Sequence, residues 1–163
     1  MKILLAVDQS TFSQEAIRML ASQVRPKGNQ VRVLHVIEHT TAYLSADLFP
    51  HFVRQTALME RDIEAESRAL VEGAVKKLRR AGIKARGVVE KGNANRIILG
   101  QAAKWKADLI VMGSHGLRGL KRVLMGSVST GIVRDATCSV QVVRAQGRRR
   151  VAANRKRKSK GNR

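Results

Sequence analysis

The chain has 163 residues and a formal net charge of +20 at pH 7, with 44% hydrophobic but only 3% aromatic residues. This length fits one domain with an aliphatic core, the mix typical of a parallel sheet covered by helices. A single cysteine, Cys138, excludes an internal disulfide framework and a cysteine-based metal cluster, and no apolar run reaches the roughly 20 residues that cross a bilayer.

The basic charge is concentrated at the end of the chain. From Arg144 onward there are ten Lys or Arg residues and no acid, which leaves 22 basic against 12 acidic residues in 1–143. We therefore expect a moderately basic folded body over residues 1–144 and a disordered, strongly basic tail over residues 145–163. The short apolar start stops at Asp8, which indicates a strand and not a secretory signal, and we expect a cytoplasmic protein.

Apolar runs and helical patterns alternate along the body. Strands are predicted over residues 2–7, 31–37, 83–90, 107–112 and 139–143, and helices over residues 11–24, 51–80, 93–106 and 127–135. Strict alternation predicts an α/β fold: a single-domain, Rossmann-like, five-stranded parallel sheet with helices on both faces and right-handed crossovers.

Local signals set the expected ends of these helices. Thr11 with Gln14 predicts a capping box at the first helix, and Asn93 predicts a cap at the third. Gly82 is expected to end the long second helix. The predicted buried stripe of that helix is Ile63, Leu70, Val71, Ala74 and Leu78.

Ligands of open α/β sheets bind at the carboxyl ends of the strands, where the strand order reverses. The loop after residues 2–7 carries Asp8, and the loop after residues 107–112 is rich in glycine from Gly113 to Gly126. Glycines let backbone N–H groups approach an anion, and Ser127 opens a helix whose positive end would face it. Three basic side chains add charge to the loop: Arg118, Lys121 and Arg122. The pattern predicts a phosphate cradle with neither Walker nor dinucleotide spacing.

The G-x2-G-x9-G-S pattern over residues 113–127 resembles the nucleotide motif of the ATP-binding universal stress proteins. Residues 7–10 are similar to that family's first loop, and residues 108–116 to its most typical segment. Residues 126–129 and 138–140 resemble the end of its domain, except that Ser139 stands where the family usually has proline. The glycine spacing gains specificity because it falls in register with five predicted strands.

The resemblance implies strand order 3-2-1-4-5, a homodimer joined through residues 139–143, and a stress-response protein that binds ATP. It implies that ATP, with Mg²⁺ brought by the phosphates, lies at the carboxyl ends of strands 2–7 and 107–112. The nucleotide-binding residues that it implies are Asp8, Val36, Gly113, His115, Gly116, Gly126, Ser127, Val128 and Ser129.

Other chemistry-bearing residues have simpler interpretations. We expect His115 to contribute its backbone, because no acid or second histidine lies near it in sequence to make a catalytic base. His35 is expected to pack or hydrogen-bond within a strand, Cys138 to be a small buried residue, and Trp105 to pack under the sheet. Neither His39 nor His51 is expected to bind metal.

Three functions remain open. The first is an ATP-binding regulatory protein with no dedicated reaction and at most slow ATP hydrolysis. The alternative is a nucleotide-independent dimeric scaffold that associates with nucleic acid or other polyanions through its tail. An anionic membrane surface is a lesser option for that tail. The tail residues expected to bind polyanions are Arg148, Arg149, Arg150, Arg155, Lys156, Arg157 and Lys158. The third, a nucleotidyl transferase or phosphatase, lacks a nucleophile or a metal-ligand cluster in the sequence.

Overall fold

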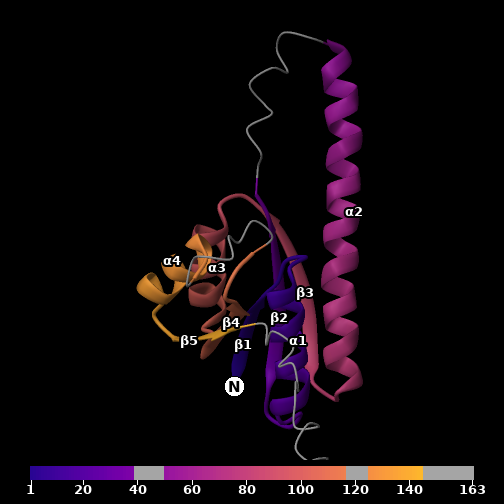
Figure 1. The fold of residues 1–163 in the computed structure, drawn as a ribbon. Helices are drawn as coiled ribbons and strands as arrows, with labels where there is room; N and C mark the ends of the chain where they lie inside the picture. The colour runs from indigo at the N-terminus through magenta and orange to yellow at the C-terminus, as the bar shows by residue number, and fades with distance from the viewer. Residues whose placement is uncertain (39–49, 117–124, 145–163) are drawn as a thin grey trace, which may run out of the picture.

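The computed structural model describes residues 1–38, 50–116 and 125–144, with side chains in the long second helix from Leu58 onward. Five strands alternate with four helices (Figure 1). The strands are β1 (Lys2–Ala6), β2 (Gln30–Ile37), β3 (Lys84–Lys91), β4 (Leu109–Gly113) and β5 (Ser139–Val143). The helices are α1 (Thr11–Gln23), α2 (Pro50–Arg80), α3 (Ala94–Trp105) and α4 (Ser127–Asp135).

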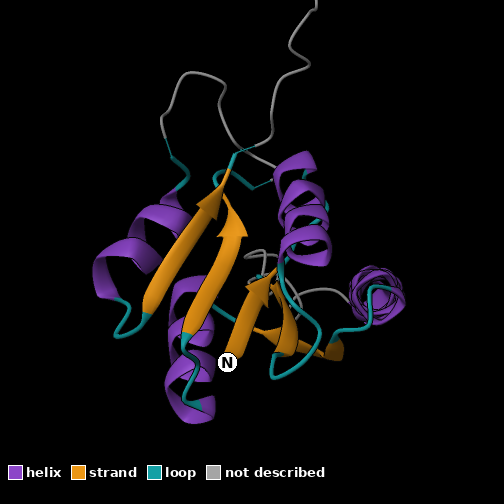
Figure 2. Cartoon of the chain, turned by 90° about the horizontal axis from the view of Figure 1, so that it is seen from below, coloured by secondary structure: helices purple, strands orange, loops and turns teal. Residues whose placement is uncertain are grey.

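The five strands form one parallel sheet of order β3-β2-β1-β4-β5, which confirms the predicted fold. Ile3 of the central strand is paired with Val31 on one side and with Leu109 on the other. The helices lie on both faces of the sheet, and one helix is seen end-on in Figure 2. The strand order reverses between β1 and β4, so the loops that follow these two strands open side by side.

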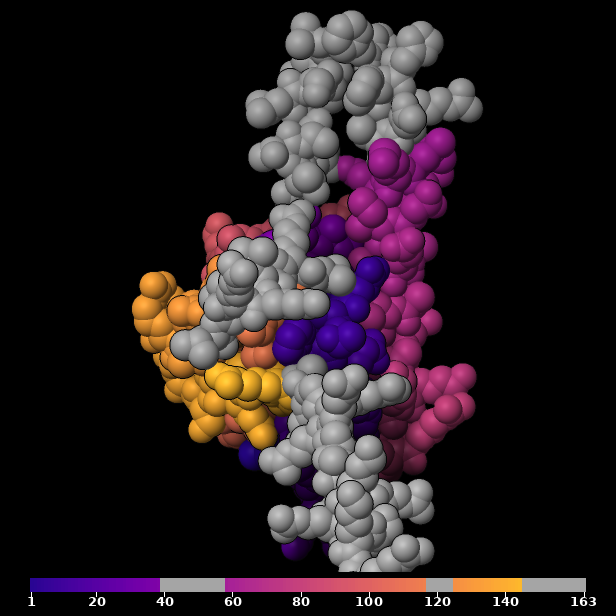
Figure 3. All heavy atoms as spheres, viewed as in Figure 1, coloured from indigo at the N-terminus to yellow at the C-terminus, as the bar shows by residue number. Residues whose placement is uncertain are grey.

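The core consists of two aliphatic clusters, one on each face of the sheet. Ile3 and Leu5 face α1 and α2, whereas Leu4 and Ala6 face α3 and α4. This alternation is the two-residue period of a strand, and Ile3, Leu4 and Leu5 are fully buried because helices cover both faces. In Figure 3 the α1 region lies between α2 and β5 on the visible surface.

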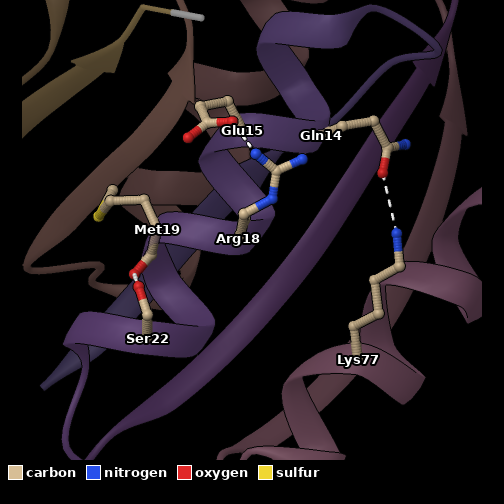
Figure 4. Close-up of polar contacts among 6 residues, drawn as sticks. All are labelled: Gln14, Glu15, Arg18, Met19, Ser22 and Lys77. Carbon is tan, nitrogen blue, oxygen red and sulfur yellow. Dashed lines mark hydrogen bonds and ion pairs between the residues drawn. The ribbon is translucent and has the colours of Figure 1, made fainter. Parts of the chain in front are cut away.

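The predicted capping box at Thr11 is wrong by one residue. Ser10 is the N-cap of α1, and its Oγ accepts a hydrogen bond from the backbone N–H of Ser13 at 3.1 Å. The Gln14 side chain does not return to the cap; its Oε1 accepts a hydrogen bond from Lys77 Nζ at 3.0 Å, across to α2 (Figure 4). A capping serine on the preceding residue satisfies the same orphan donors, so Thr11 becomes the first helical residue.

The buried stripe of α2 is shorter than predicted. Val71, Ala74 and Leu78 are buried, but Ile63 is 47% exposed. Figure 1 shows the reason, because the amino-terminal part of α2 extends beyond the end of the sheet. The apolar side of α2 therefore continues beyond the part of the helix that packs against the sheet.

Other predicted boundaries hold. Asn93 caps α3 by accepting a hydrogen bond from the Arg96 N–H at 3.0 Å, and Gly82 follows α2 at a φ of +79°, which favours glycine. The bounds of α4 and β5 match the prediction at both ends, whereas β1 to β4 differ from it by one or two residues at their ends. The predictions for residues 39–49, the loop cations and the tail lie outside the described residues.

Candidate functional site at the carboxyl ends of β1 and β4

The loop after β1 fixes the Asp8 carboxylate. Asp8 Oδ1 accepts a hydrogen bond from the Ser10 N–H at 3.0 Å and lies 2.5 Å from Ser10 Oγ. The Asp8 N–H donates to Ser13 Oγ at 2.9 Å. The same network that caps α1 therefore sets the orientation of the carboxylate at the tip of the strand.

The loop after β4 is joined to this network through Ser114 and His115. The Ser114 N–H donates to the Val143 carbonyl at 2.7 Å, and the Ser114 carbonyl accepts from the Gly126 N–H at 2.8 Å and from Ser129 Oγ at 2.9 Å. The buried Ser114 thus holds the start of α4 against the end of β4. Sequence reasoning missed this residue, because its contribution is a pair of backbone groups that no motif marks.

His115 connects the two loops. Its carbonyl oxygen lies 3.2 Å from Ser10 Oγ, its Nδ1 lies 3.0 Å from Ser114 Oγ, and its ring centroid lies 5.0 Å from that of Phe12. The His115 backbone carbonyl thus joins the β4 loop to the cap of α1, and its ring packs against Phe12 of α1.

The start of α4 presents backbone donors. Gly126 is the N-cap, with no side-chain hydrogen bond to the cap and no acidic residue in the first turn of the helix. The N–H groups of the first turn of a helix have no partner within the helix, and the helix dipole is positive there. The amides of Ser127 and Val128 are thus suited to an anion.

The three motif glycines allow close approach, and among the described residues none of them has a positive φ. A Cβ on Gly113 would lie 2.8 Å from Phe12 Cβ and 3.0 Å from the Ser13 nitrogen, so this glycine lets α1 pack on β4. A Cβ on Gly116 would lie 2.9 Å from Asp8 Oδ2. A Cβ on Gly126 would have only ordinary contacts, at 3.5 Å or more. The backbone conformation of these glycines is therefore one that other residues can adopt, and the close contacts at Gly113 and Gly116 are what favours glycine there.

These groups surround a hollow of about 470 Å³. All nine residues predicted to bind nucleotide line it: Asp8, Val36, Gly113, His115, Gly116, Gly126, Ser127, Val128 and Ser129. Residues that the sequence did not single out as ligand contacts also line it, among them Ile63, Glu66 and Ser67 of α2, His35 and Glu38 of β2 and its end, and Ile98 of α3. The α2 residues escaped notice because only the tertiary fold brings that helix over the ends of the strands.

No group of three or more His, Cys, Asp or Glu side chains that could hold a metal ion occurs in residues 1–38, 50–116 and 125–144. Within the same ranges, no helix is long and apolar enough to cross a bilayer.

The remaining candidate residues have structural partners. His35 Nδ1 lies 2.7 Å from the Val7 carbonyl oxygen, as expected of a hydrogen-bonded strand histidine. Cys138 is half-buried, and burial is the main cause that raises the pKa of its thiol. Trp105 packs against the α3–α4 side of the core, as predicted. His39 lies outside the described residues, as does the side chain of His51.

Comparisons with known proteins cover most of the chain. The sequence profile of the universal stress protein family matches residues 1–144. Universal stress protein A homolog 1 of Coxiella burnetii is 37% identical over 145 residues, which are 86% of this chain and 94% of that protein. These matches extend over the whole sheet and the candidate site.

Solved structures agree with the sequence comparisons. The fold matches that of the MJ0577 protein of Methanocaldococcus jannaschii with a TM-score of 0.75 and 25% identity, covering 90% of this chain and 96% of that one. A universal stress protein family protein of Arabidopsis thaliana, solved with AMP bound, gives a TM-score of 0.64 at 23% identity, covering 90% and 92%. With this fold and these matches, the chain belongs to the universal stress protein family.

Proposed function

We propose that this universal stress protein binds ATP in the hollow at the carboxyl ends of β1 and β4. The observation that carries the proposal is the convergence of Asp8, Gly116 and the uncapped start of α4 on one hollow. Its volume of about 470 Å³ falls in the range of roughly 300–1,000 Å³ typical of small-molecule sites.

The lining of the hollow combines the polar and apolar groups that a nucleotide requires. The amides of Ser127 and Val128 would supply donors for phosphate oxygens, and glycine at 126 leaves space beside them. Val36 and Ile98 give apolar surface, and Asp8 would supply a fixed acceptor for hydroxyl or amino groups. The AMP bound to the Arabidopsis relative supports an adenine nucleotide as the class of ligand.

Mg²⁺ would enter with the phosphates. Because no group of metal-ligating side chains occurs in the described part of the chain, phosphate oxygens and water would supply the coordination. The ion would screen phosphate charge, while the α4 amides orient the phosphates. The protein's own contribution is then binding and orientation.

The proposed role is regulatory, with no dedicated reaction. The ring of His115, one of the titratable groups of the lining, lies 3.0 Å through its Nδ1 from Ser114 Oγ and packs at a tilt against Phe12, an arrangement that serves the loop connection. Binding of ATP across the β1 and β4 loops would stabilise one arrangement of the surface around the site, and partner choice would follow from that population shift.

Titration calorimetry of Mg·ATP into the full chain tests the proposal. The parent is expected to bind one ATP per chain, and Gly126→Val is expected to weaken binding by about tenfold or more because its side chain occupies the space beside the amides of Ser127 and Val128. Gly100→Ala is the matched control, since a Cβ there has nothing within 4 Å and lies on α3 away from the lining.

Two results would contradict the proposal. One is an unchanged affinity in a Gly126→Val variant that keeps the stability of the parent. The other is heat that persists in that variant and disappears with salt, which would assign the nucleotide to the basic residues of the chain and not to the hollow.

A further inference from the structure

A second and larger hollow, of about 720 Å³, lies at the opposite end of the sheet from the proposed ATP site. It is formed by the first residues of β2 and β3, the turn at Gly82 and the last residue of α3. Its basic members are Arg32, Arg79, Lys84 and Arg86, and the lining contains no acidic residue. We name this surface the amino-end groove.

Two arginines of the groove face each other across the sheet. Arg32 on β2 is the register partner of Arg86 on β3, and Lys84 lies two pairs before it, opposite Gln30. Strand alternation places all three on the α3 side, because Val31, Val33 and Ala85 belong to the core on the α2 side. The register therefore gathers three cations on one face at the start of β2 and β3.

Contacts with a helix end or with hydrogen-bond acceptors offset the charge of only some of these cations. Arg79 lies in the last turn of α2, where a cation complements the helix dipole, and its Nε donates to the Ala85 carbonyl at 3.1 Å. Arg32 donates to Gln101 Oε1 at 2.9 Å, a neutral amide that in turn bonds Glu90. Within the described residues, no ion pair joins an acid to Lys84 or Arg86.

An aromatic ring lies beside the cations. The Arg32 guanidinium lies over the Trp105 indole, with Cζ 4.3 Å from the ring centroid, and Lys2 Nζ lies 6.0 Å from the same centroid. Lys2 also donates to the Trp105 carbonyl at 3.2 Å. A guanidinium over an indole offers a surface on which a nucleobase can stack, and Lys84 and Arg86, two residues apart on β3, are spaced as phosphate partners.

We propose that the amino-end groove binds single-stranded nucleic acid, with phosphates at Lys84 and Arg86 and a base on the Arg32–Trp105 layer. Single strands fit better than duplex because a base must be free to stack on that layer. This binding is separate from the ATP site, which lies at the other end of the strands, and from the polyanion binding expected of the tail.

Trp105 is the single tryptophan of the chain, so its fluorescence reports on this groove and not on the tail. A single-stranded oligonucleotide of about 20 nucleotides, titrated into the full chain, is expected to quench Trp105 emission to saturation. Lys84→Gln/Arg86→Gln should raise the midpoint about fivefold or more and lower the salt slope of log K by about 1.4, the value for two lost phosphate contacts on a single strand.

The matched control also removes two positive charges, but from a surface outside the groove. Arg61→Gln/Lys76→Gln changes two exposed cations of α2 outside the groove and is expected to shift the midpoint by no more than about twofold. Because the tail is present in every variant, its contribution cancels. ATP binding at the other end of the sheet should be the same in both double variants.

Several outcomes would overturn the proposal. Oligonucleotide binding seen by anisotropy with no change in Trp105 emission would place the nucleic acid elsewhere on the chain. Equal shifts in the two double variants would show that only net charge matters. Quenching by poly-L-glutamate or by pyrophosphate at the same concentration would assign the groove to acidic peptides or small anions.

Discussion

The motif glycines have different structural roles, which their spacing in the sequence does not distinguish. At Gly113 a Cβ would meet the backbone of Phe12 and Ser13 at 2.9 and 3.0 Å, so this glycine is required by the packing of α1 on β4. At Gly126 the surroundings are open enough for a side chain. The family motif therefore combines a packing requirement with a ligand requirement, and single substitutions should separate them.

Gly113→Ala should destabilise the protein by about 1–3 kcal/mol, because the clash involves backbone atoms that cannot rotate away. Gly100→Ala, in the open interior of α3, should instead stabilise it by about 0.5–1 kcal/mol. Chemical denaturation of both variants checks the pair. Equal midpoints would show that α1 has room to move off β4.

The reactivity of the Cys138 thiol is expected to depend on pH. Burial raises the pKa of its thiol, with Asp108 adding to the shift, so the neutral form is favoured in the folded protein. Its reaction with a disulfide reagent at pH 8 should be slower than that of a free cysteine and should keep rising as the pH passes 9. The contribution of the neutral thiol to the free energy of unfolding is fully present below the pKa of the thiol in the unfolded chain. It is lost as the pH rises through the higher pKa of the thiol in the folded protein. A rate that levels off below pH 8 would contradict this environment.

At the scale of elements, the helices and strands were predictable where the signal is local. The apolar core of β4, the cap at Asn93 and the bounds of α4 and β5 follow from short patterns that tertiary contacts reinforce. The prediction failed at Thr11 because Ser10 offered a competing cap, and at Ile63 because a helical period says nothing about where the sheet beneath it ends.

The distinction between local patterns and tertiary packing also applies to the candidate site. The family resemblance implied nine residues that share one hollow in the structure, since parallel strands deliver their carboxyl ends to one edge. Glu66 and Ser67 of α2, and the anchoring role of Ser114, depend on packing between distant segments and could not be found from spacing. The amino-end groove escaped notice for the same reason, because Arg32 and Arg86 meet only through strand register.

At the scale of the whole molecule, the two edges of the sheet differ. The outer strand β3 carries Lys84, Arg86, Glu90 and Lys91, and charges of this kind discourage pairing with another sheet. The other outer strand, β5, reads Ser-Val-Gln-Val-Val with no charge. The uncharged edge supports the proposal of a homodimer joined through β5.

Ser139→Lys/Gln141→Lys places two charges at exposed positions of β5 and should shift the chain to monomer, because the paired strands would bring like charges together. Light scattering after size exclusion checks the mass. The control Lys84→Gln/Arg86→Gln should leave the dimer intact. A parent that is monomeric at all concentrations, or a dimer lost only in the control, would contradict the β5 interface.

The most direct test of the central claim is an amide NMR titration of the full chain with Mg·ATP at moderate salt. We expect saturable shifts at the amides of Ser127 and Val128, with smaller shifts around Asp8, and unchanged signals at Arg32 and Arg86. Shifts confined to residues 145–163, or centred on the amino-end groove, would contradict an ATP site at the carboxyl ends of β1 and β4.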